Sequence, residues 1–583
     1  MTASRATPSS AALARTLAGW WPWAVETDAD LDRALAYLGL GVDAATVERG
    51  ARALATGLFV VALLAGAALG AAGTTPYISA LASAVALGSG AALGTLVVAR
   101  RGPPFVATLA RTRALGEAAG LVSRAALRLR VDPTVERAAA FAARTGTGPL
   151  ARSLGSHVER AAGTGRTGLA GFVAEWGERF PALDRAVSRL DSAAAAPAEK
   201  RDRHLDRAVD AALDGVADEL AAFAGEIRGP VTGLYAFGVL LPLALVGVLP
   251  AARVAGVRVS LPAVVGVYDL LLPVVVTATG AWLLARRPVA FPPPDVGRDH
   301  PDVPDTPIRA VGAGGLAAVA GFLLVDRAVA AWAAPVAAAG LGPGVALVVC
   351  FRPARRVHDR VTAVESNLDD ALYLVGRRVE AGAAVESAIE TAAESVPGAT
   401  GRLLADAAAR QRRLSVTVRT AFLGDSGALG DLPSPRTRET ATLFALAATE
   451  GEPAGHALVT LADHVERLQR IERTARRDLS RVTDTLANTA AVFGPLVGGA
   501  TVALSARVAA TGTTRFGADA LPTAALGVAV GAYVLWLAVA LTALSTGLTH
   551  GLDRVRVGYR TGLALCLATC SYLAAYVGAG LLL

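Results

Sequence analysis

Residues 454–508 read AGHALVTLADHVERLQRIERTARRDLSRVTDTLANTAAVFGPLVGGATVALSARV. The first part of this stretch is polar, with Leu, Val and Ala recurring every three or four residues from Leu458 to Leu486. This spacing places the apolar side chains on one face of a helix. The remainder, 488–508, is apolar and long enough to cross a bilayer, which needs about 20 residues. The sequence therefore predicts a long helix that leaves a polar domain and continues into a membrane span.

The composition of the whole chain is typical of a membrane protein. Of its 583 residues, 53% are hydrophobic and 18% are charged, and the mean hydropathy is +0.46. Soluble chains average about 25% charged residues. Nine stretches are apolar enough to span, at 53–72, 77–99, 231–251, 262–285, 309–325, 328–350, 488–508, 522–545 and 562–582. The predicted fold is all-α: a polytopic membrane protein with about nine transmembrane helices and two cytoplasmic helical-bundle domains in a tandem repeat.

Arginine residues predict the orientation of these spans, because positive side chains concentrate on the cytoplasmic side. The arginines that decide it are Arg100, Arg101, Arg228, Arg286, Arg287, Arg309, Arg352, Arg355, Arg356, Arg554, Arg556 and Arg560. The expected order is 1–52, cytoplasmic; 53–99, hairpin; 100–230, cytoplasmic domain; 231–285, hairpin; 286–308, cytoplasmic loop; 309–350, hairpin; 351–487, cytoplasmic domain; 488–545, hairpin; and 562–582, last span. The protein is thus expected in the cell membrane, with its C-terminus outside.

Several kinds of chemistry lack the residues that they need. The only lysine, Lys200, does not follow a glycine-rich loop, so no Walker A nucleotide site is expected. The seven histidines include no HExxH pair, and the three cysteines lie in apolar runs. In 351–487, 19 arginines are balanced by 19 acidic residues, which disfavours nucleic-acid binding. We expect no catalytic residue, no metal and no cofactor, and therefore no enzyme.

Asp326 and Arg327 lie between the fifth and sixth spans and have two interpretations. Charges in the middle of a bilayer are costly, whereas charges in a tight turn outside it are not. The pair is therefore either that turn or part of a proton or ion path. The second interpretation would make the protein a secondary transporter, with the Pro- and Gly-containing stretch 335–343 of span six as its irregular helix.

The spans and polar segments repeat with a period of about 256 residues, counted from span one to span five. Locally, Thr134–Ala138 aligns with Ala384–Ala388, and Gly177-Glu178 aligns with Gly451-Glu452. The polar segments are predicted to be helical. In the second, helices are expected near 361–379 and 383–396 and from about 454, with a loop at 424–433. Ser434-Pro435 has the pattern of an N-cap followed by the first helical residue.

Two stretches of the second polar segment resemble a known family. They are Thr449-Glu450-Gly451-Glu452-Pro453-Ala454-Gly455-His456-Ala457-Leu458, followed by Leu461 and Ala462, and the helix, glycine turn and helix of 374–389. With the topology, they resemble the F-domain membrane proteins of type II secretion and type IV filament systems. The resemblance covers most of 101–550 and is closest to platform proteins of archaeal pili and archaella and of tight-adherence pili. The first copy is degenerate, since Gly177-Glu178-Arg179-Phe180-Pro181 lacks the second glycine.

The resemblance implies a non-enzymatic platform at the base of a filament. Such a protein binds a hexameric cytoplasmic secretion ATPase, which acts in trans, and receives pilin-like subunits from the lipid bilayer; its oligomeric state is open, a homodimer included. The candidate contact residues are Gly451, Glu452, Gly455, Gly177 and Glu178. Glu452 either pairs with a basic ATPase surface or stabilises the first turn of its own helix. Two interpretations compete with this one: a secondary transporter, and a membrane scaffold or receptor unrelated to pili.

Overall fold

The computed structural model describes residues 15–38, 41–71, 85, 88–89, 92–107, 117–146, 148–163, 167–178, 180–255, 261–288, 296, 300–303, 307–450, 452–510 and 523–582. All regular elements in these residues are helices, as the sequence predicts. The chain divides into two compact units, Met1–Leu115 with Ala285–Val289, and Gly116–Leu284 with Ala290–Leu583.

The first unit contains α2 (Ala29–Leu38) and α3 (Ala44–Ala71). Its buried Glu48 pairs with Arg100 at 2.6 Å and lies 3.9 Å from Arg52. Helix α3 covers the predicted first span as far as residue 71, whereas much of the predicted second span, 77–99, lies outside the described residues.

Seven helices among the described residues are long and apolar enough to cross a membrane, and they match predicted spans three to nine. They are Glu199–Leu249, Pro262–Arg286, Ile308–Ala328, Ala331–Glu380, Leu458–Ala510, Thr523–His550 and Arg554–Leu582. Three of them have 50 or more residues: 51 in the first, 50 in the fourth and 53 in the fifth. About 50 helical residues measure about 75 Å, more than twice the roughly 30 Å of a hydrocarbon core. These three helices therefore extend well beyond the apolar part of a bilayer.

The first helical bundle consists of α5 (Ala118–Val131), α6 (Val135–Thr145), α7 (Pro149–Ala161), α8 (Gly168–Trp176), α9 (Pro181–Ala195) and α10 (Ala198–Tyr235). Apolar side chains recur every three or four residues along α10 from Leu205 to Ile227, a spacing that predicts one apolar face, and this face is buried. Burial of this face against α5 and α9 stabilises a helix whose other side chains are mostly polar.

The second helical bundle consists of α16 (Leu368–Glu380), α17 (Val385–Ser395), α18 (Gly398–Leu414), α19 (Val418–Leu423), α20 (Pro435–Glu450) and α21 (Glu452–Asn488). The helical spacing predicts that Leu368, Leu372, Val375 and Val379 of α16 and Val385, Ala388, Ile389 and Ala392 of α17 face inward, and all of these side chains are buried. Ser434 caps α20, because the Thr437 backbone N–H donates to Ser434 Oγ at 3.0 Å, which confirms the predicted N-cap.

The helix predicted near 361–379 is present but interrupted. Two residues, Ser366 and Asn367, separate the end of α15 (Ala334–Glu365) from the start of α16. Asn367 leaves helical geometry, with φ −127° and ψ 28°, and its side-chain amide donates to the Pro397 carbonyl at 3.0 Å. An asparagine side chain that bonds to a distant backbone group competes in this way with helix continuation.

The two bundles have the same order of six helices, which supports the predicted repeat. Thr167 caps α8 by accepting from the Ala170 N–H, and Thr417 caps α19 in the same way from Thr420. Each long helix then continues as a short π-helical segment, Ala236–Leu240 after α10 and Thr489–Phe493 after α21. The apolar helices α11 (Leu241–Val254) and α22 (Gly494–Ala510) follow these π-helical segments.

This order corrects one of the two alignments made from the sequence. The pairing of Val135 with Val385 is consistent with the structure, since these residues begin α6 and α17. The pairing of Gly177 with Gly451 is wrong, because Gly177 precedes the fifth helix of its bundle, α9, whereas residue 451 follows the fifth helix of the other bundle, α20. Gly177 ends α8, and its counterpart is Gly424, which ends α19. A Cβ atom at either glycine would lie 2.7 Å from the carbonyl oxygen four residues earlier, so the two positions share the same local constraint.

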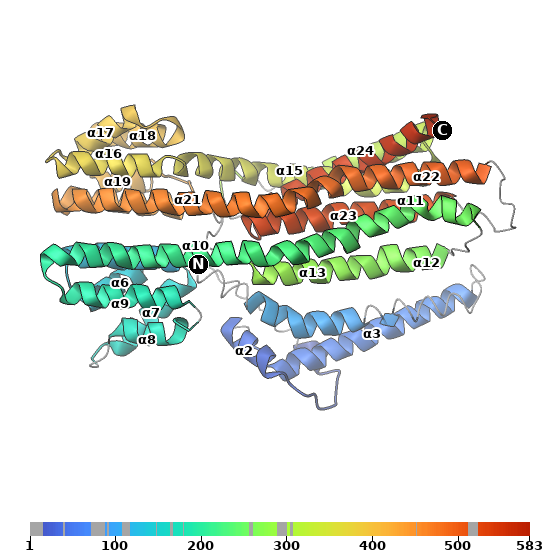
Figure 1. Ribbon diagram of the computed structural model, residues 1–583, viewed down its shortest axis with the longest axis horizontal. Coiled ribbons are helices and arrows are strands. Elements are labelled where there is room, and N and C mark those ends of the chain that lie inside the picture. Colours follow the sequence, from blue (N-terminus) through green and yellow to red (C-terminus); the bar gives the residue numbers. More distant parts are fainter. Residues whose placement is uncertain are drawn as a thin grey trace. The chain divides into compact units, whose positions relative to one another are not determined.

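The remaining apolar helices complete the second unit. Helix α12 (Leu261–Val265) continues through a π-helical segment, Gly266–Leu271, into α13 (Leu272–Arg286). The others are α14 (Pro307–Ala328), α23 (Thr523–His550) and α24 (Arg554–Leu582). Helix α24 packs against α15, α22 and α23. Within this unit, the short helices of both bundles lie at one end of α10 and α21, and α11, α22 and α24 lie toward the other (Figure 1).

Candidate functional site

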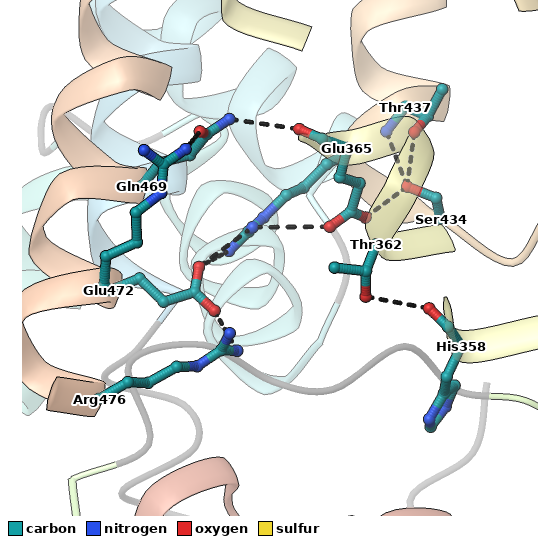
Figure 2. A network of polar contacts seen from close by, with 10 residues as sticks. His358, Thr362, Glu365, Ser434, Thr437, Gln469, Glu472 and Arg476 are labelled. Carbon is teal, nitrogen blue, oxygen red and sulfur yellow. Dashed lines mark hydrogen bonds and ion pairs between the residues drawn. The ribbon is translucent and has the colours of Figure 1, made fainter. Parts of the chain in front are cut away.

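A network of polar side chains joins the second helical bundle to the helix that enters it (Figure 2). At its centre is Glu472 of α21, whose side chain is buried. Glu472 Oε2 accepts from Arg436 at 3.3 Å, and Oε1 pairs with Arg476. From the sequence, Glu472 is only an interruption in an apolar spacing. The structure explains it, because a buried carboxylate is stable when charged partners satisfy it.

The end of α15 belongs to the same network. Ser434 Oγ donates to Glu365 Oε1 at 2.6 Å, and Gln469 Nε2 donates to the Glu365 carbonyl oxygen at 3.3 Å. Arg436 lies 3.6 Å from Glu365 Oε2, so one guanidinium serves both Glu365 and Glu472. These contacts fix the end of α15 to the start of α20 and the middle of α21.

A buried contact between a histidine and an aspartate lies about two turns earlier along α15. His358 Nδ1 is 3.2 Å from Asp553 Oδ2, and the two side chains are 1% and 4% exposed. Asp553 Oδ1 also accepts the backbone N–H groups of Val555 and Arg556, at 2.9 and 3.3 Å, and so caps α24. Burial opposes ionisation of Asp553, but His358 and the two N–H groups outweigh it and hold the pKa below its ordinary value.

We call these two clusters the polar junction: His358, Glu365, Ser434, Arg436, Gln469, Glu472, Arg476 and Asp553. It connects α15, α20, α21 and the start of α24 with buried, charge-assisted contacts. Such contacts are directional, and breaking one leaves a buried charge without its partner. The polar junction can therefore hold the second bundle and the apolar helices in a fixed geometry. Within the described residues, no cluster of His, Cys, Asp and Glu could hold a metal ion.

The two bundles contact each other through a different set of charges. Arg124 of α5 donates to both carboxylate oxygens of Glu439 on α20, at 2.7 and 2.9 Å. Arg467 of α21 reaches Asp210 and Asp214 of α10, at 2.5 and 2.7 Å. These pairs are partly exposed, and pairs of that kind contribute about 0–1 kcal/mol each. These ion pairs are thus weaker than the contacts of the polar junction, whereas α10 and α21 also share a buried apolar cluster that includes Phe223 and Leu479.

The first bundle holds a partly buried carboxylate that predicts a pH effect. Burial raises the pKa of Glu117 from 4.5 to about 7, although the Leu150 N–H at the start of α7 and two nearby arginines favour its charge. A folded-state pKa above the unfolded one stabilises the fold at low pH, and this contribution is lost as the pH rises from 4.5 to about 7. Gly148 makes room for the group, since a Cβ atom there would lie 2.0 Å from Glu117 Oε1.

We therefore expect Glu117→Gln to flatten the pH dependence of stability. Across the window from 4.5 to about 7, the wild type should lose up to about 3 kcal/mol relative to the variant, because one pKa unit corresponds to about 1.4 kcal/mol. Thermal unfolding of the purified full chain between pH 4.5 and 8 measures this difference. Parallel curves for the two proteins would contradict the raised pKa.

The structure does not gather the five predicted contact residues into one site. Gly451 and the side chain of Glu452 lie outside the described residues, although α21 begins at Glu452. Gly455 is buried between α21 and α16, where a Cβ atom would lie 2.4 Å from the Glu380 backbone nitrogen. Gly455 therefore allows the close packing of α21 and α16 and is not exposed for contact with a partner. Gly177 and the exposed Glu178 lie in the first bundle, at the end of α8.

Asp326 and Arg327 are exposed in the last turn of α14, directly before a turn in which the Val329 and Ala330 N–H groups both donate to the Val325 carbonyl. This location agrees with the turn interpretation. Helix α15 is continuous through 335–343, where Gly340 faces Thr569 of α24 and Gly342 faces Ala318 of α14. Its glycines therefore serve close helix packing.

Sequence reasoning missed the pair of His358 and Asp553. One signal was available, because an aspartate just before an apolar helical run is a common N-cap. The partner was not predictable, since His358 precedes Asp553 by almost 200 residues. Comparison with known proteins gives no significant match to this chain among family models, curated proteins or solved structures.

Proposed function

We propose that the protein is the membrane platform of a type IV pilus, archaellum or type II secretion-like machine. It couples a hexameric cytoplasmic secretion ATPase, which acts in trans, to the insertion of pilin-like subunits into a filament. The observation that carries this proposal is a pair of long helices, Glu199–Leu249 with 51 residues and Leu458–Ala510 with 53 residues, each of which runs from a helical bundle into an apolar span. A continuous helix transmits a push or rotation along its axis, which a flexible linker does not.

The two kinds of polar contact suit this role. The polar junction fixes the end of α15 to α20, α21 and α24. A force on the second bundle would therefore move the apolar helices together with it. The partly exposed ion pairs between the bundles, by contrast, oppose relative movement of the bundles only weakly. The arginine distribution predicts that both bundles lie in the cytoplasm, where a motor could reach them.

The start of α21 is the segment that we assign to the ATPase. Helix α21 begins at Glu452, and the 53 residues Leu458–Ala510 continue it into an apolar span. A force applied near Glu452 would therefore act on the end of a long helix. The transporter alternative lacks a comparable observation. Asp326 and Arg327 lie at a helix end, and α15 is unbroken where that alternative expects an irregular helix.

Co-purification tests the proposal. The tagged full chain should retain the hexameric secretion ATPase encoded by the same organism, and deletion of 351–487 should abolish retention. Glu452→Arg should weaken binding about tenfold, the effect of losing about 1.4 kcal/mol at an interface. Glu394→Arg is the matched control, because Glu394 is an exposed carboxylate on α17 of the same bundle.

Equal binding by wild type and Glu452→Arg would remove the assigned segment, and absence of ATPase binding by the full chain would remove the platform function. Reconstituted vesicles separate the transporter alternative. A transporter would move solute without a partner and lose flux in Asp326→Ala, whereas a platform should assemble filaments normally with that substitution.

A further inference from the structure

A group of arginine side chains lies where α15 and α24 leave their apolar spans on the side of the second bundle. The two helices pack against each other in opposite directions. Phe351 fills the space beside Gly558, and two turns further His358 pairs with Asp553. This register brings one segment of α15 next to the first turns of α24. We call the arginines of these segments the arginine collar: Arg352, Arg355, Arg356, Arg556 and Arg560.

Three members of the arginine collar lack a salt bridge in the described part of the chain, although Asp484 attracts one of them, Arg560, electrostatically. Arg352, Arg356 and Arg560 are exposed, and none forms a salt bridge with a described residue. Within the collar, Arg560 lies close enough to Arg355 and Arg556 for their like charges to repel one another. An anion from outside the chain would relieve this repulsion.

The other two members are only partly neutralised. Arg355 lies 3.7 Å from Asp359, and its guanidinium carbon is 4.5 Å from the centre of the Tyr559 ring. Arg556 lies 3.5 Å from Asp553, whose carboxylate already pairs with His358. The acidic residues of this region therefore do not balance the arginine collar.

We propose that the arginine collar binds the headgroup of an anionic phospholipid. The collar directly follows the apolar residues of α15 and directly precedes those of α24, which is the depth at which lipid phosphates lie. Basic groups between membrane helices at this depth bind anionic headgroups, and an aromatic ring such as that of Tyr559 is typical of the same level. Guanidinium groups bind phosphate oxygens in pairs. The proposal does not depend on filament assembly.

Lipid titration of the full chain tests this site. The protein is purified in neutral detergent, and phosphatidylglycerol or phosphatidylcholine is added at equal mole fractions, with bound lipid measured by native mass spectrometry. Phosphatidylglycerol should bind more tightly than phosphatidylcholine. The triple variant Arg352→Gln, Arg356→Gln, Arg560→Gln should bind it about a hundredfold more weakly, since each arginine contributes about 1 kcal/mol near an anionic surface.

The double variant Arg402→Gln, Arg419→Gln is the matched control. Both arginines are exposed on short helices of the second bundle, and neither forms a salt bridge with a described residue. This variant should bind phosphatidylglycerol as the wild type does. If the triple variant does not fold, Arg356→Gln alone should weaken binding about fivefold, because it removes one exposed contact.

Three results would overturn the proposal. They are equal affinity for the two lipids, phosphatidylglycerol binding by the collar variant within threefold of the wild type, and equal loss of binding in the control variant. A separate competition experiment adds inorganic phosphate at the same concentration as the lipid. Displacement of the lipid by phosphate alone would assign the arginine collar to a soluble anion rather than to a headgroup.

Discussion

Gly455→Ala is expected to destabilise the second helical bundle by about 2–3 kcal/mol or more. A Cβ atom at this position would lie 2.4 Å from the Glu380 backbone nitrogen, 2.9 Å from its Cα and 3.0 Å from the Gly376 carbonyl oxygen. All three neighbours are backbone atoms, so no side chain can move aside and α16 must separate from α21. Overpacking of this kind typically costs 1–3 kcal/mol. Thermal unfolding and hydrogen exchange of α16 and α21 in the full chain measure the effect.

Gly225→Ala is the control for this prediction. Gly225 lies in the long helix of the first bundle, and a Cβ atom there would meet nothing within 4 Å. The same chemical change should therefore be neutral or stabilise the helix by up to about 1 kcal/mol, the difference in helix propensity. If Gly455→Ala behaved like Gly225→Ala, the close contact of α16 and α21 would be disproved.

Asp553→Ala is expected to cost about 2–4 kcal/mol, of which about 1–3 kcal/mol is the typical effect of removing one partner from a buried polar contact. The substitution leaves His358 buried without its carboxylate and removes the cap of α24, for which about 1 kcal/mol is usual. Hydrogen exchange at the start of α24 should rise together with the loss of thermal stability. A change below about 1 kcal/mol would contradict the role of this pair.

Asp359→Ala is the matched control, because Asp359 lies one residue from His358 but is exposed and 3.7 Å from Arg355. It should cost less than about 1 kcal/mol. The pH dependence adds a second check. Since the pKa of Asp553 is lowered from 3.8 in the folded state, its contribution is present above pH 3.8 and is lost as the pH falls through the folded-state pKa. The difference between wild type and Asp553→Ala should therefore shrink in acid.

Expectations based on helical spacing agree well with the structure. The buried faces of α10, α16 and α17, the N-cap at Ser434 and the long helix from the second bundle into span seven all follow from local patterns. The break at Asn367 was not predictable, because it depends on a contact with Pro397, which the chain reaches only after two more helices. The repeat alignment failed at Gly177 because one glycine among 61 carries little positional information.

Local sequence by itself determined that this protein is helical, which segments are apolar enough for lipid and which faces are buried. These properties depend on hydrophobicity and on a period of 3.6 residues, and both are written along the chain. Only the tertiary structure decided that Glu472 shares Arg436 with Glu365, that His358 meets Asp553, and that Gly455 packs against α16. Each of these contacts joins residues far apart in sequence, and a charge or a glycine has no preferred partner until packing supplies one.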